Sequence, residues 1–224
     1  MVLDTYMRVC IEKEVPLMAT RPYFFIKNQK VVERFANFEW VPGLHISRKK
    51  MNVRNLHAAI PMKTLEVSTK SDEPLGVKLS AFSLIYDEGI KLESYYQASK
   101  VFDNGGPFRD IAFKSPKEAK SDPRLKTSGK FIGFYDVDED QKWGLGEPYY
   151  DYIYIKTAFK NLSDEELEQL ASYDAFTDIE FNPAKSYNTQ ARAIAILKLL
   201  YSIFGRVELN KKDFVAFEKM YVSI

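Results

Sequence analysis

The sequence predicts a helix-rich α+β protein, with strands and helices gathered in separate parts of the chain. Strand-like segments cluster before residue 90, signals for helix starts dominate after it, and the regular strand–helix alternation of a doubly wound sheet is missing. The length of 224 residues fits one large domain or a domain with an extension. A chain of this size buries roughly 70–75% of the surface that its unfolded form exposes.

The N-terminal segments predict a β-hairpin. Residues 22–26 are aromatic and extended, 27–30 are typical turn residues, and 31–40 alternate as a second strand. Ahead of this hairpin, 9–15 is compatible with a helix.

Residues 48–59 predict the next helix, with Ser47 as its N-cap and Pro61 at its end. The polar face of this helix carries four cations: Arg48, Lys49, Lys50 and Arg54. Such a face either contacts phosphate groups or is simply solvated. The solvated face is the more common arrangement, so it is the interpretation that the pattern alone favours.

A central helix follows a stretch of short elements. Ser94 with Gln97 fits a capping box, so a helix is predicted to begin there and to run to about residue 102. Residues 104–107 stop it, and their glycine pair is interpreted as a helix C-cap. The short elements before it are strands at 65–69 and 79–86, a loop at 72–76 and a turn at 87–89.

Helices dominate the second half of the chain. Ser115, with a proline after it and Glu118 three positions on, is a strong helix start. The next expected elements are a strand at 130–136, a Tyr-rich amphipathic helix at 148–160 and a helix at 163–173 that Ser163 opens with Glu166. An extended segment at 176–181 and a loop at 182–186 follow. The last elements are a helix at 188–204 ended by Gly205 and a final helix to 221 capped by Asn210.

The composition limits the chemistry that the chain is able to perform. With 32 Lys plus Arg against 31 Asp plus Glu, the net charge is +1, so DNA contact requires a local basic patch. The single Cys10 excludes an intramolecular disulfide and a thiolate metal cluster, and two histidines exclude a three-histidine zinc site. We therefore expect no metal and no cofactor, and catalysis based on carboxylates, lysines, hydroxyls and amides.

Targeting signals and familiar catalytic motifs are missing from the sequence. No apolar run approaches the roughly 20 residues that span a bilayer, and no secretory signal is evident, so we expect a cytoplasmic protein without membrane contact. The sequence has no Gly-x-Gly-x-x-Gly fingerprint, Walker-type loop, Gly-x-Ser-x-Gly elbow or His-Glu-x-x-His pair. His45 and His57 lack an evident orienting partner and are interpreted as structural or surface residues.

One constellation remains after these exclusions. Glu93, Gln97 and Lys100 recur at i, i+4 and i+7, which places a carboxylate, an amide and an ammonium on one helix face. Spacing alone favours an ordinary helix with a surface Glu–Lys pair, because such pairs are common.

The segment around this constellation resembles the NADAR (YbiA-like) family. Residues 79–82, Gly89 and residues 93–102 are similar to a Ser-Asn-Phe element followed by a Glu-His-Tyr-x-Gln-Ala-x-Lys-Phe helix start. Ala81 replaces the Asn of that family and Ser94 replaces its His. Further similar segments follow in the family's order: 70–76, 115–120, 150–152, 178–180 and 186–191.

The resemblance covers about residues 65–205, and 38–40, 56–59 and 173–183 resemble the NADAR subgroup associated with DarT-type toxins. It implies a NADAR/YbiA-like fold with an N-terminal hairpin-plus-helix extension. The expected division is an extension at 1–62, a catalytic domain at 63–208 and a C-terminal helix at 209–224.

The resemblance also implies an activity. The subgroup removes ADP-ribose from guanine bases in DNA, so the implied partners are ADP-ribosylated DNA, ADP-ribose as product and a DarT-type toxin. Breaking the N-glycosidic bond suits Glu93 as general acid/base. A desolvated lysine suits the nucleophile that forms a Schiff base. The family match points first to Lys70 for that lysine, with Lys100 as runner-up or as a diphosphate contact.

The expected substrate contacts have roles that follow from their chemistry. Asp178 and Glu180 suit ribose hydroxyls or a water, although alternation along a strand buries only one of its two faces. Asn188 and Arg192 suit phosphate oxygens. Trp143 either stacks on a base or anchors a loop, and Phe82 fits the core better than a ligand contact. The full set is Ser80, Phe82, Tyr96, Gln97, Lys100, Trp143, Asp178, Glu180, Asn188 and Arg192.

Two alternative functions remain open at the level of sequence. One is an N-glycosidase of a small riboflavin-pathway metabolite, and the other is a non-catalytic module that binds ADP-ribose or the toxin. The presence of both Glu93 and Lys70 favours catalysis over binding alone.

Overall fold

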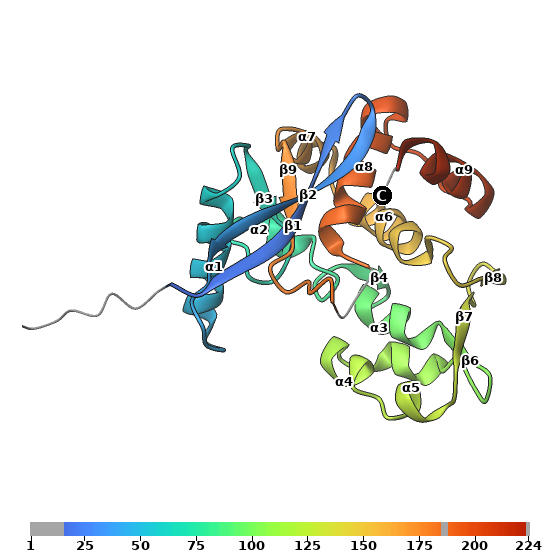
Figure 1. Cartoon of the computed structure of the whole chain (residues 1–224). Helices are drawn as coiled ribbons and strands as arrows, with labels where there is room; N and C mark the ends of the chain where they lie inside the picture. Colours follow the sequence, from blue (N-terminus) through green and yellow to red (C-terminus); the bar gives the residue numbers. More distant parts are fainter. Residues whose placement is uncertain (1–15, 185–187, 223–224) are drawn as a thin grey trace, which may run out of the picture.

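The N-terminal hairpin forms as its sequence predicts. The computed structural model describes residues 16–184 and 188–222, and in it β1 (Met18–Lys27) pairs antiparallel with β2 (Lys30–Glu39) (Figure 1). The turn residues Asn28 and Gln29 have φ of 52° and 56°. Positive φ at both turn positions matches the right-handed twist of the strands.

Some predictions lie outside the described residues. They are the helix at 9–15, Cys10, and the part of the 182–186 loop and of the 186–191 segment that falls on 185–187.

A four-stranded sheet joins distant parts of the chain in the order β2-β1-β9-β3. The strand β9 (Ala175–Thr177) pairs antiparallel with β1 and parallel with β3 (Thr64–Glu66). At the other end of the hairpin, Val222 bridges to Val31. The hairpin and the described C-terminal end are therefore both tied to the same sheet.

Helices cover both faces of this sheet, because side chains alternate along a strand. Phe24 and Phe176 belong to the main core with helix α8 (Gln190–Phe204), whereas Phe38 and Ala175 pack with helix α1 (Ile46–Ala58) in a second cluster. Figure 1 shows α1 and α8 on opposite sides of the hairpin.

The start of α1 differs from the prediction. Its N-cap is His45, whose ring accepts the Ser47 N–H, so Ser47 already belongs to the helix. The buried face of α1 presents Val53 and Leu56 to the second cluster, while Met51 is exposed. A polar N-cap acceptor is still present, but it lies two residues earlier than the sequence pattern indicated.

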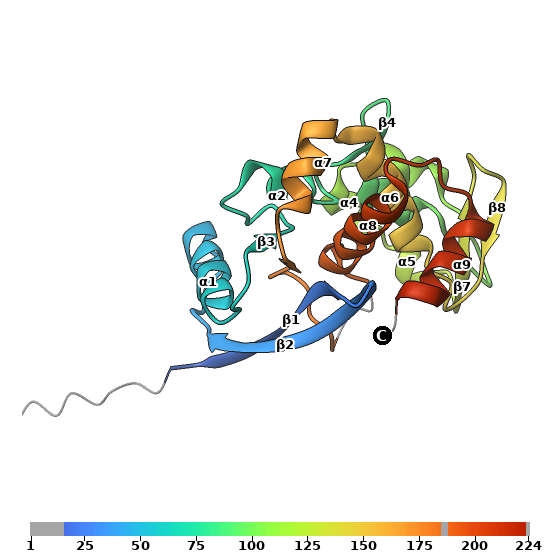
Figure 2. The same ribbon diagram turned by 90° about the horizontal axis from the view of Figure 1, so that it is seen from above.

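The main core is built from α6 (Tyr149–Asn161) and α8, with α7 (Asp164–Ala171) and α9 (Lys211–Tyr221) packed around them. The helix α6 is buried on almost every side, so the predicted amphipathic character is wrong: its many tyrosines pack inward with their rings. Figure 2 shows α9 next to the hairpin of β7 (Phe131–Asp136) and β8 (Gln141–Trp143). The caps predicted at Ser163, Gly205 and Asn210 are confirmed.

The central segments form a second group of elements below the main core in Figure 1. It contains α3 (Leu92–Ala98), a 3-10 turn at Arg109–Phe113, α4 (Pro116–Lys120) and α5 (Arg124–Thr127). A three-stranded sheet of β6 (Lys100–Phe102), β7 (Phe131–Asp136) and β8 (Gln141–Trp143) completes it. The strand at 130–136 and the capping box at Ser115 are thereby confirmed.

The central helix begins earlier and ends earlier than predicted. Lys91 is the N-cap of α3, and the hydroxyl of Ser94 is buried and donates to the Lys114 carbonyl instead of capping. After Ala98 the chain turns into β6, where the β-branched Val101 pairs with β7. The glycine pair at 105–106 consequently follows a strand and is no helix C-cap.

Two further local predictions are wrong. The expected loop at 72–76 contains the short helix α2 (Pro74–Lys78), which starts with proline in its first turn. The expected strand at 79–86 is mostly turns, and only β4 (Ile85–Asp87) pairs, with β5 (Ile90–Lys91). Leu79 and Leu84 are buried in the core. A short apolar run of this kind is compatible with a strand or with buried turns, and periodicity alone does not distinguish the two.

Among the described residues, no helix combines the length and apolar character needed to cross a membrane.

Candidate active site

A polar cleft of about 650 Å³ opens where two parallel strands end. The chain leaving β3 supplies residues 68–70, and the chain leaving β9 supplies residues 178–182. Crevices beyond the carboxyl ends of parallel strands are common ligand sites. The opposite wall comes from α3 and the start of β6, and the segment before α8 closes one side.

The cleft collects most of the predicted site residues. They come from five separate segments of the chain, so tertiary structure is needed to bring them together. The predicted residues that line the cleft are Lys70, Ser80, Phe82, Glu93, Tyr96, Gln97, Lys100, Asp178, Glu180 and Asn188.

Trp143 does not reach the cleft, contrary to the expectation that it stacks on a base. Only 1% of its surface is exposed, and its ring packs on Tyr149 and Tyr152. The ammonium of Lys211 lies 4.6 Å from the centre of the Trp143 ring. The tryptophan therefore anchors β8 against α6 and α9.

Arg192 also lies outside the cleft. Its guanidinium pairs with Asp151 on α6 and with Glu218 on α9, at 2.6 Å for the latter. Burial raises the pKa of Asp151 to about 6, although the charge of Arg192 opposes the shift. Arg192 thus balances the charge of a buried carboxylate. The sequence alone could not distinguish such a structural cation from one that binds phosphate.

Glu93 lies in the first turn of α3 with its carboxylate at the cleft and only 6% of the residue exposed. The Gln97 amide donates to Glu93 Oε1 at 2.9 Å, as the i, i+4 spacing predicts. Lys120 Nζ lies 4.0 Å from the same oxygen. These contacts hold the Glu93 carboxylate in a fixed position at the cleft, within reach of a bound ligand.

Lys100 reaches the cleft from β6, although it does not belong to the helix of Glu93. Its ammonium lies 5.3 Å from the centre of the Tyr96 ring. Burial lowers the pKa of Lys100, the charge of Glu93 opposes this shift, and the charge of Lys120 adds to it. Desolvation is one of the ways in which a protein keeps a lysine amine nucleophilic.

Lys70 is placed by the turn that follows β3. Its backbone N–H donates to Ser68 Oγ at 3.1 Å, and its ammonium donates to Thr69 Oγ1 at 2.7 Å. Within the described part of the chain, the Lys70 ammonium forms no ion pair with a carboxylate. A lysine that points into the cleft without a carboxylate partner is available to a substrate.

A buried acidic network supports the floor of the cleft. Burial raises the pKa of Asp178, which accepts a hydrogen bond from Gln190 at 3.1 Å. Behind it, Glu66 is 1% exposed and accepts from Ser68, Thr177 and the Ile179 N–H at 2.6, 2.8 and 2.9 Å. Burial and the nearby Asp178 raise the pKa of Glu66.

His57 and the backbone of Ala81 make further contacts with this network. His57 is hydrogen bonded to Thr177 Oγ1 at 2.9 Å, and burial lowers the pKa of its ring to about 4. It therefore has a structural role, as the sequence indicated. Ala81, which replaces the family asparagine, uses its backbone N–H to donate to Gln190 Oε1 at 2.6 Å.

Asp178 and Glu180 lie in different surroundings, because both follow the end of β9 at Thr177 and the chain turns at residues 179–180. Glu180 is exposed and pairs with Lys49 of α1 at 2.7 Å. Asn188 donates to the hydroxyl of Tyr96 at 2.9 Å and precedes Thr189, the N-cap of α8.

Three of the four cations on the basic face of α1 form ion pairs. Besides the Lys49–Glu180 pair, Lys50 and Arg54 both pair with Asp72, at 3.1 and 2.9 Å. The structure therefore supports the solvated, ion-paired interpretation of this helix face more than direct phosphate binding.

Several residues of the site were not predicted from the sequence. Lys120, Tyr150 and Gln190 are among those that line the cleft, and Glu66 lies directly behind it. Lys120, Tyr150 and Gln190 fall within the segments that resemble the family, which was the available signal. Glu66 had no signal beyond its place in a predicted strand.

No group of three or more His, Cys, Asp or Glu side chains within the described ranges is arranged to hold a metal ion. The cleft combines buried carboxylates with three lysines in an α+β fold, which places the protein in the class of α+β proteins with a pocket whose groups are suited to acid–base and amine chemistry.

Comparison with known families identifies this class more closely. The chain belongs to the DarT1-associated NADAR antitoxins, since the model of that family matches residues 19–223. The match includes most of the N-terminal hairpin and confirms the resemblance seen in the sequence. A toxin of the DarT class is the partner that this family indicates. No curated protein matches the chain.

Proposed function

We propose that this protein is an ADP-ribosyl glycohydrolase that removes ADP-ribose from guanine bases in DNA and so counteracts a DarT-type toxin. The observation that carries the proposal is the buried Glu93 carboxylate facing a cleft that also contains Lys70, Lys100 and Lys120. The volume of about 650 Å³ lies within the range of small-molecule sites, roughly 300–1,000 Å³.

The proposed reaction divides one difficult step into two. Glu93 donates a proton as the ribose opens, and the amine of Lys70 adds to C1″. The guanine amino group leaves, so that the lysine holds the sugar as a Schiff base. Water then hydrolyses the Schiff base, which releases ADP-ribose and restores the lysine.

Several residues are proposed to orient the sugar. Asp178 suits the ribose hydroxyls, because its carboxyl is buried and already fixed by Gln190. Gln97 keeps Glu93 in place, and Tyr96 with Asn188 forms a polar edge of the cleft. Ser80, Phe82 and Glu180 line the same cavity and are proposed as further contacts. A substrate in DNA implies a cytoplasmic location.

The decisive experiment uses a DNA oligomer that carries ADP-ribosylated guanine, with release followed by mass spectrometry. We expect wild type to release ADP-ribose and Glu93→Gln to be slower by about 10²–10⁴-fold, the usual contribution of a general acid or base. Glu88→Gln, an exposed change in the β4–β5 turn, is the matched control and is expected to behave as wild type. If neither wild type nor Glu93→Gln releases ADP-ribose, the proposed enzyme activity is excluded.

The choice of lysine has a separate test. Borohydride added during turnover reduces the Schiff base and leaves a stable adduct on the nucleophile. We expect the adduct to be lost in Lys70→Ala and kept in Lys78→Ala, a control on α2 whose ammonium pairs with Glu166. Because burial lowers the pKa of Lys100, this residue is the rival nucleophile. Trapping that persists in Lys70→Ala and disappears in Lys100→Ala would transfer the role to Lys100.

A further inference from the structure

Lys120 is a cation of the cleft for which the proposed reaction has no use. It is the last residue of α4, and its ammonium lies 4.0 Å from Glu93 Oε1 and 6.0 Å from the centre of the Phe82 ring. The side chain is 64% exposed, and ion pairs this exposed are weak. Lys120 therefore pairs loosely with Glu93 and is able to exchange it for a stronger anion.

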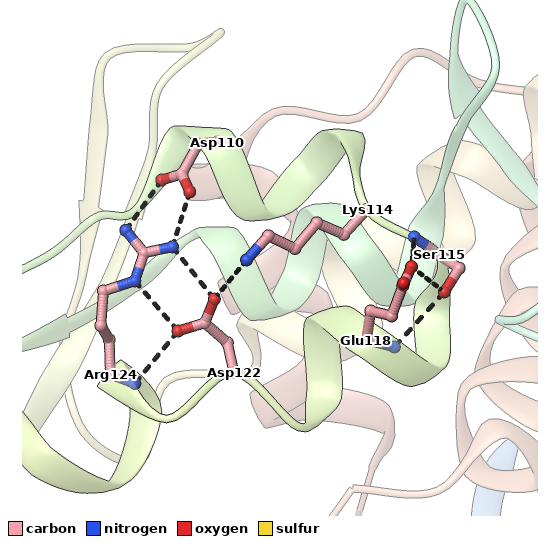
Figure 3. Close-up of polar contacts among 6 residues, drawn as sticks. All are labelled: Asp110, Lys114, Ser115, Glu118, Asp122 and Arg124. Carbon is pink, nitrogen blue, oxygen red and sulfur yellow. Dashed lines mark hydrogen bonds and ion pairs between the residues drawn. The ribbon is translucent and has the colours of Figure 1, made fainter.

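The short helix α4 is held in place at both ends by a group of side chains that we call the bracket (Figure 3). The bracket consists of Lys114, Ser115, Glu118, Asp122 and Arg124. Five residues are too few for a helix that is stable by itself. At its start, Ser115 and Glu118 form a reciprocal capping box. At its end, the nearly buried Asp122 accepts from Lys114 at 2.6 Å and from Arg124 at 2.9 Å.

Two further contacts connect this bracket to the rest of the site. Arg124 also binds Asp110 in a two-pronged pair, with contacts of 3.0 and 2.6 Å (Figure 3). The Ser94 hydroxyl donates to the Lys114 carbonyl at 2.8 Å, which joins the bracket to α3, the helix of Glu93. The backbone of Lys120 is thus fixed relative to Glu93, while its side chain remains accessible.

Lys100 supplies a second cation next to the first. Both lysines line the cleft, and the charge of Lys120 contributes to the lowered pKa of Lys100. Both cations face the carboxylate of Glu93, so two positive charges share this one nearby negative charge. A phosphate is an anion with which both ammonium groups are able to form charge-assisted hydrogen bonds.

We propose that Lys120 and Lys100 form a phosphate-binding site in the α3–α4 wall of the cleft, and that Lys120 leaves Glu93 for the phosphate when a ligand binds. The inference rests on the proposed function for the identity of the substrate. The phosphate belongs either to the diphosphate of ADP-ribose or to the DNA backbone, and both offer the same oxyanion chemistry.

The test compares Lys120→Gln with Lys117→Gln. Lys117 is an exposed cation on the same short helix, lies outside the cleft, and controls for a general change in charge. Binding is measured by calorimetry with inorganic pyrophosphate, ADP-ribose and an unmodified DNA oligomer as probes. Pyrophosphate tests the phosphate site directly, so this arm gives an answer even if the protein proves not to cleave ADP-ribosylated DNA.

We expect Lys120→Gln to weaken binding of pyrophosphate and of ADP-ribose by about 10–100-fold, the usual effect of losing one hydrogen bond to a charged group. During turnover, KM should rise with kcat nearly unchanged, and Lys120→Arg should restore much of the affinity. Loss confined to ADP-ribose and pyrophosphate identifies the diphosphate, whereas loss confined to the oligomer identifies the DNA backbone.

Either of two binding results would overturn the inference, as would one kinetic result. One is wild-type affinity of Lys120→Gln for all three probes, and the other is an equal loss in Lys117→Gln. A fall in kcat with an unchanged KM would likewise contradict phosphate binding, because it would show that Lys120 acts through Glu93 alone.

Discussion

The pH dependence of stability should report the buried Glu66 behind the cleft. Burial and the neighbouring Asp178 raise the pKa of Glu66 from 4.5 to about 8, so between these values the folded protein holds a proton that the unfolded chain has released. Its favourable contribution is complete below pH 4.5 and is lost as the pH rises through the folded pKa. Within that window the free energy of unfolding falls by about 1 kcal/mol for each pH unit.

Glu66 titrates together with its neighbour Asp178, whose pKa is also raised by burial, so the range from pH 6.5 to 8 reports on this pair. His57, with its pKa lowered to about 4, and Asp151, with its pKa raised to about 6, change protonation mainly at lower pH. Over this range we expect wild type to lose about 1.5 kcal/mol of unfolding free energy, chiefly through Glu66. Glu66→Gln keeps the size of the side chain and removes its titration, so its stability should change much less.

Urea unfolding at pH 6.5, 7.25 and 8.0 measures the effect, with Glu88→Gln as an exposed control that should keep the slope of wild type. Equal slopes for wild type and Glu66→Gln would refute the reasoning, because they would mean that Glu66 is already ionised in the folded protein at pH 6.5.

Three other substitutions test the packing and the charges around the site. Leu56→Ala should cost about 2–5 kcal/mol of unfolding free energy in urea, because Leu56 is fully buried between α1 and the sheet. Arg192→Met should cost about 3–5 kcal/mol, since it leaves Asp151 buried without its cation, yet activity per folded molecule should be unchanged. Asp122→Asn should lower the melting temperature and weaken ligand binding together, because the bracket that fixes Lys120 loses the charge that Lys114 and Arg124 share.

Each of these changes has its own control or contrary result. Met51→Ala, an exposed position on α1, should stay within about 0.5 kcal/mol of wild type. If Arg192→Met folds but loses turnover, Arg192 takes part in the reaction after all. Ligand binding of Asp122→Asn at the level of wild type would show that the bracket does not position Lys120.

Local chemistry explains which elements were predictable from the sequence. The caps at Ser115, Ser163 and Asn210 depend on contacts within a few residues, so the sequence pattern contains all that is needed. Ser94 has the same type of pattern, but its hydroxyl bonds to Lys114, twenty positions away, and the predicted cap was wrong. A local signal fails where a tertiary partner competes for the same side chain.

The site shows the same division between local and distant signals. Glu93 and Gln97 were predictable from helical spacing and do form a hydrogen bond. Arg192 and Trp143 have side chains suited to a phosphate or a base, yet each is held by core partners that no local pattern reveals. Glu66 was not predicted as part of the site, because the sequence of a three-residue strand does not indicate that its carboxylate is buried.

The parallel pairing of β3 with β9 also determines when the cleft forms during synthesis. Glu66 and Thr177 are hydrogen bonded although 111 positions separate them, and the floor of the cleft further requires Gln190. A nascent chain that has completed Lys70 and Glu93 still lacks the second strand end on which the cavity depends. Pairing across such a distance has to wait for loop closure. Translation that stops before Gln190 consequently leaves no partial antitoxin, because one wall of the cavity has not yet been made.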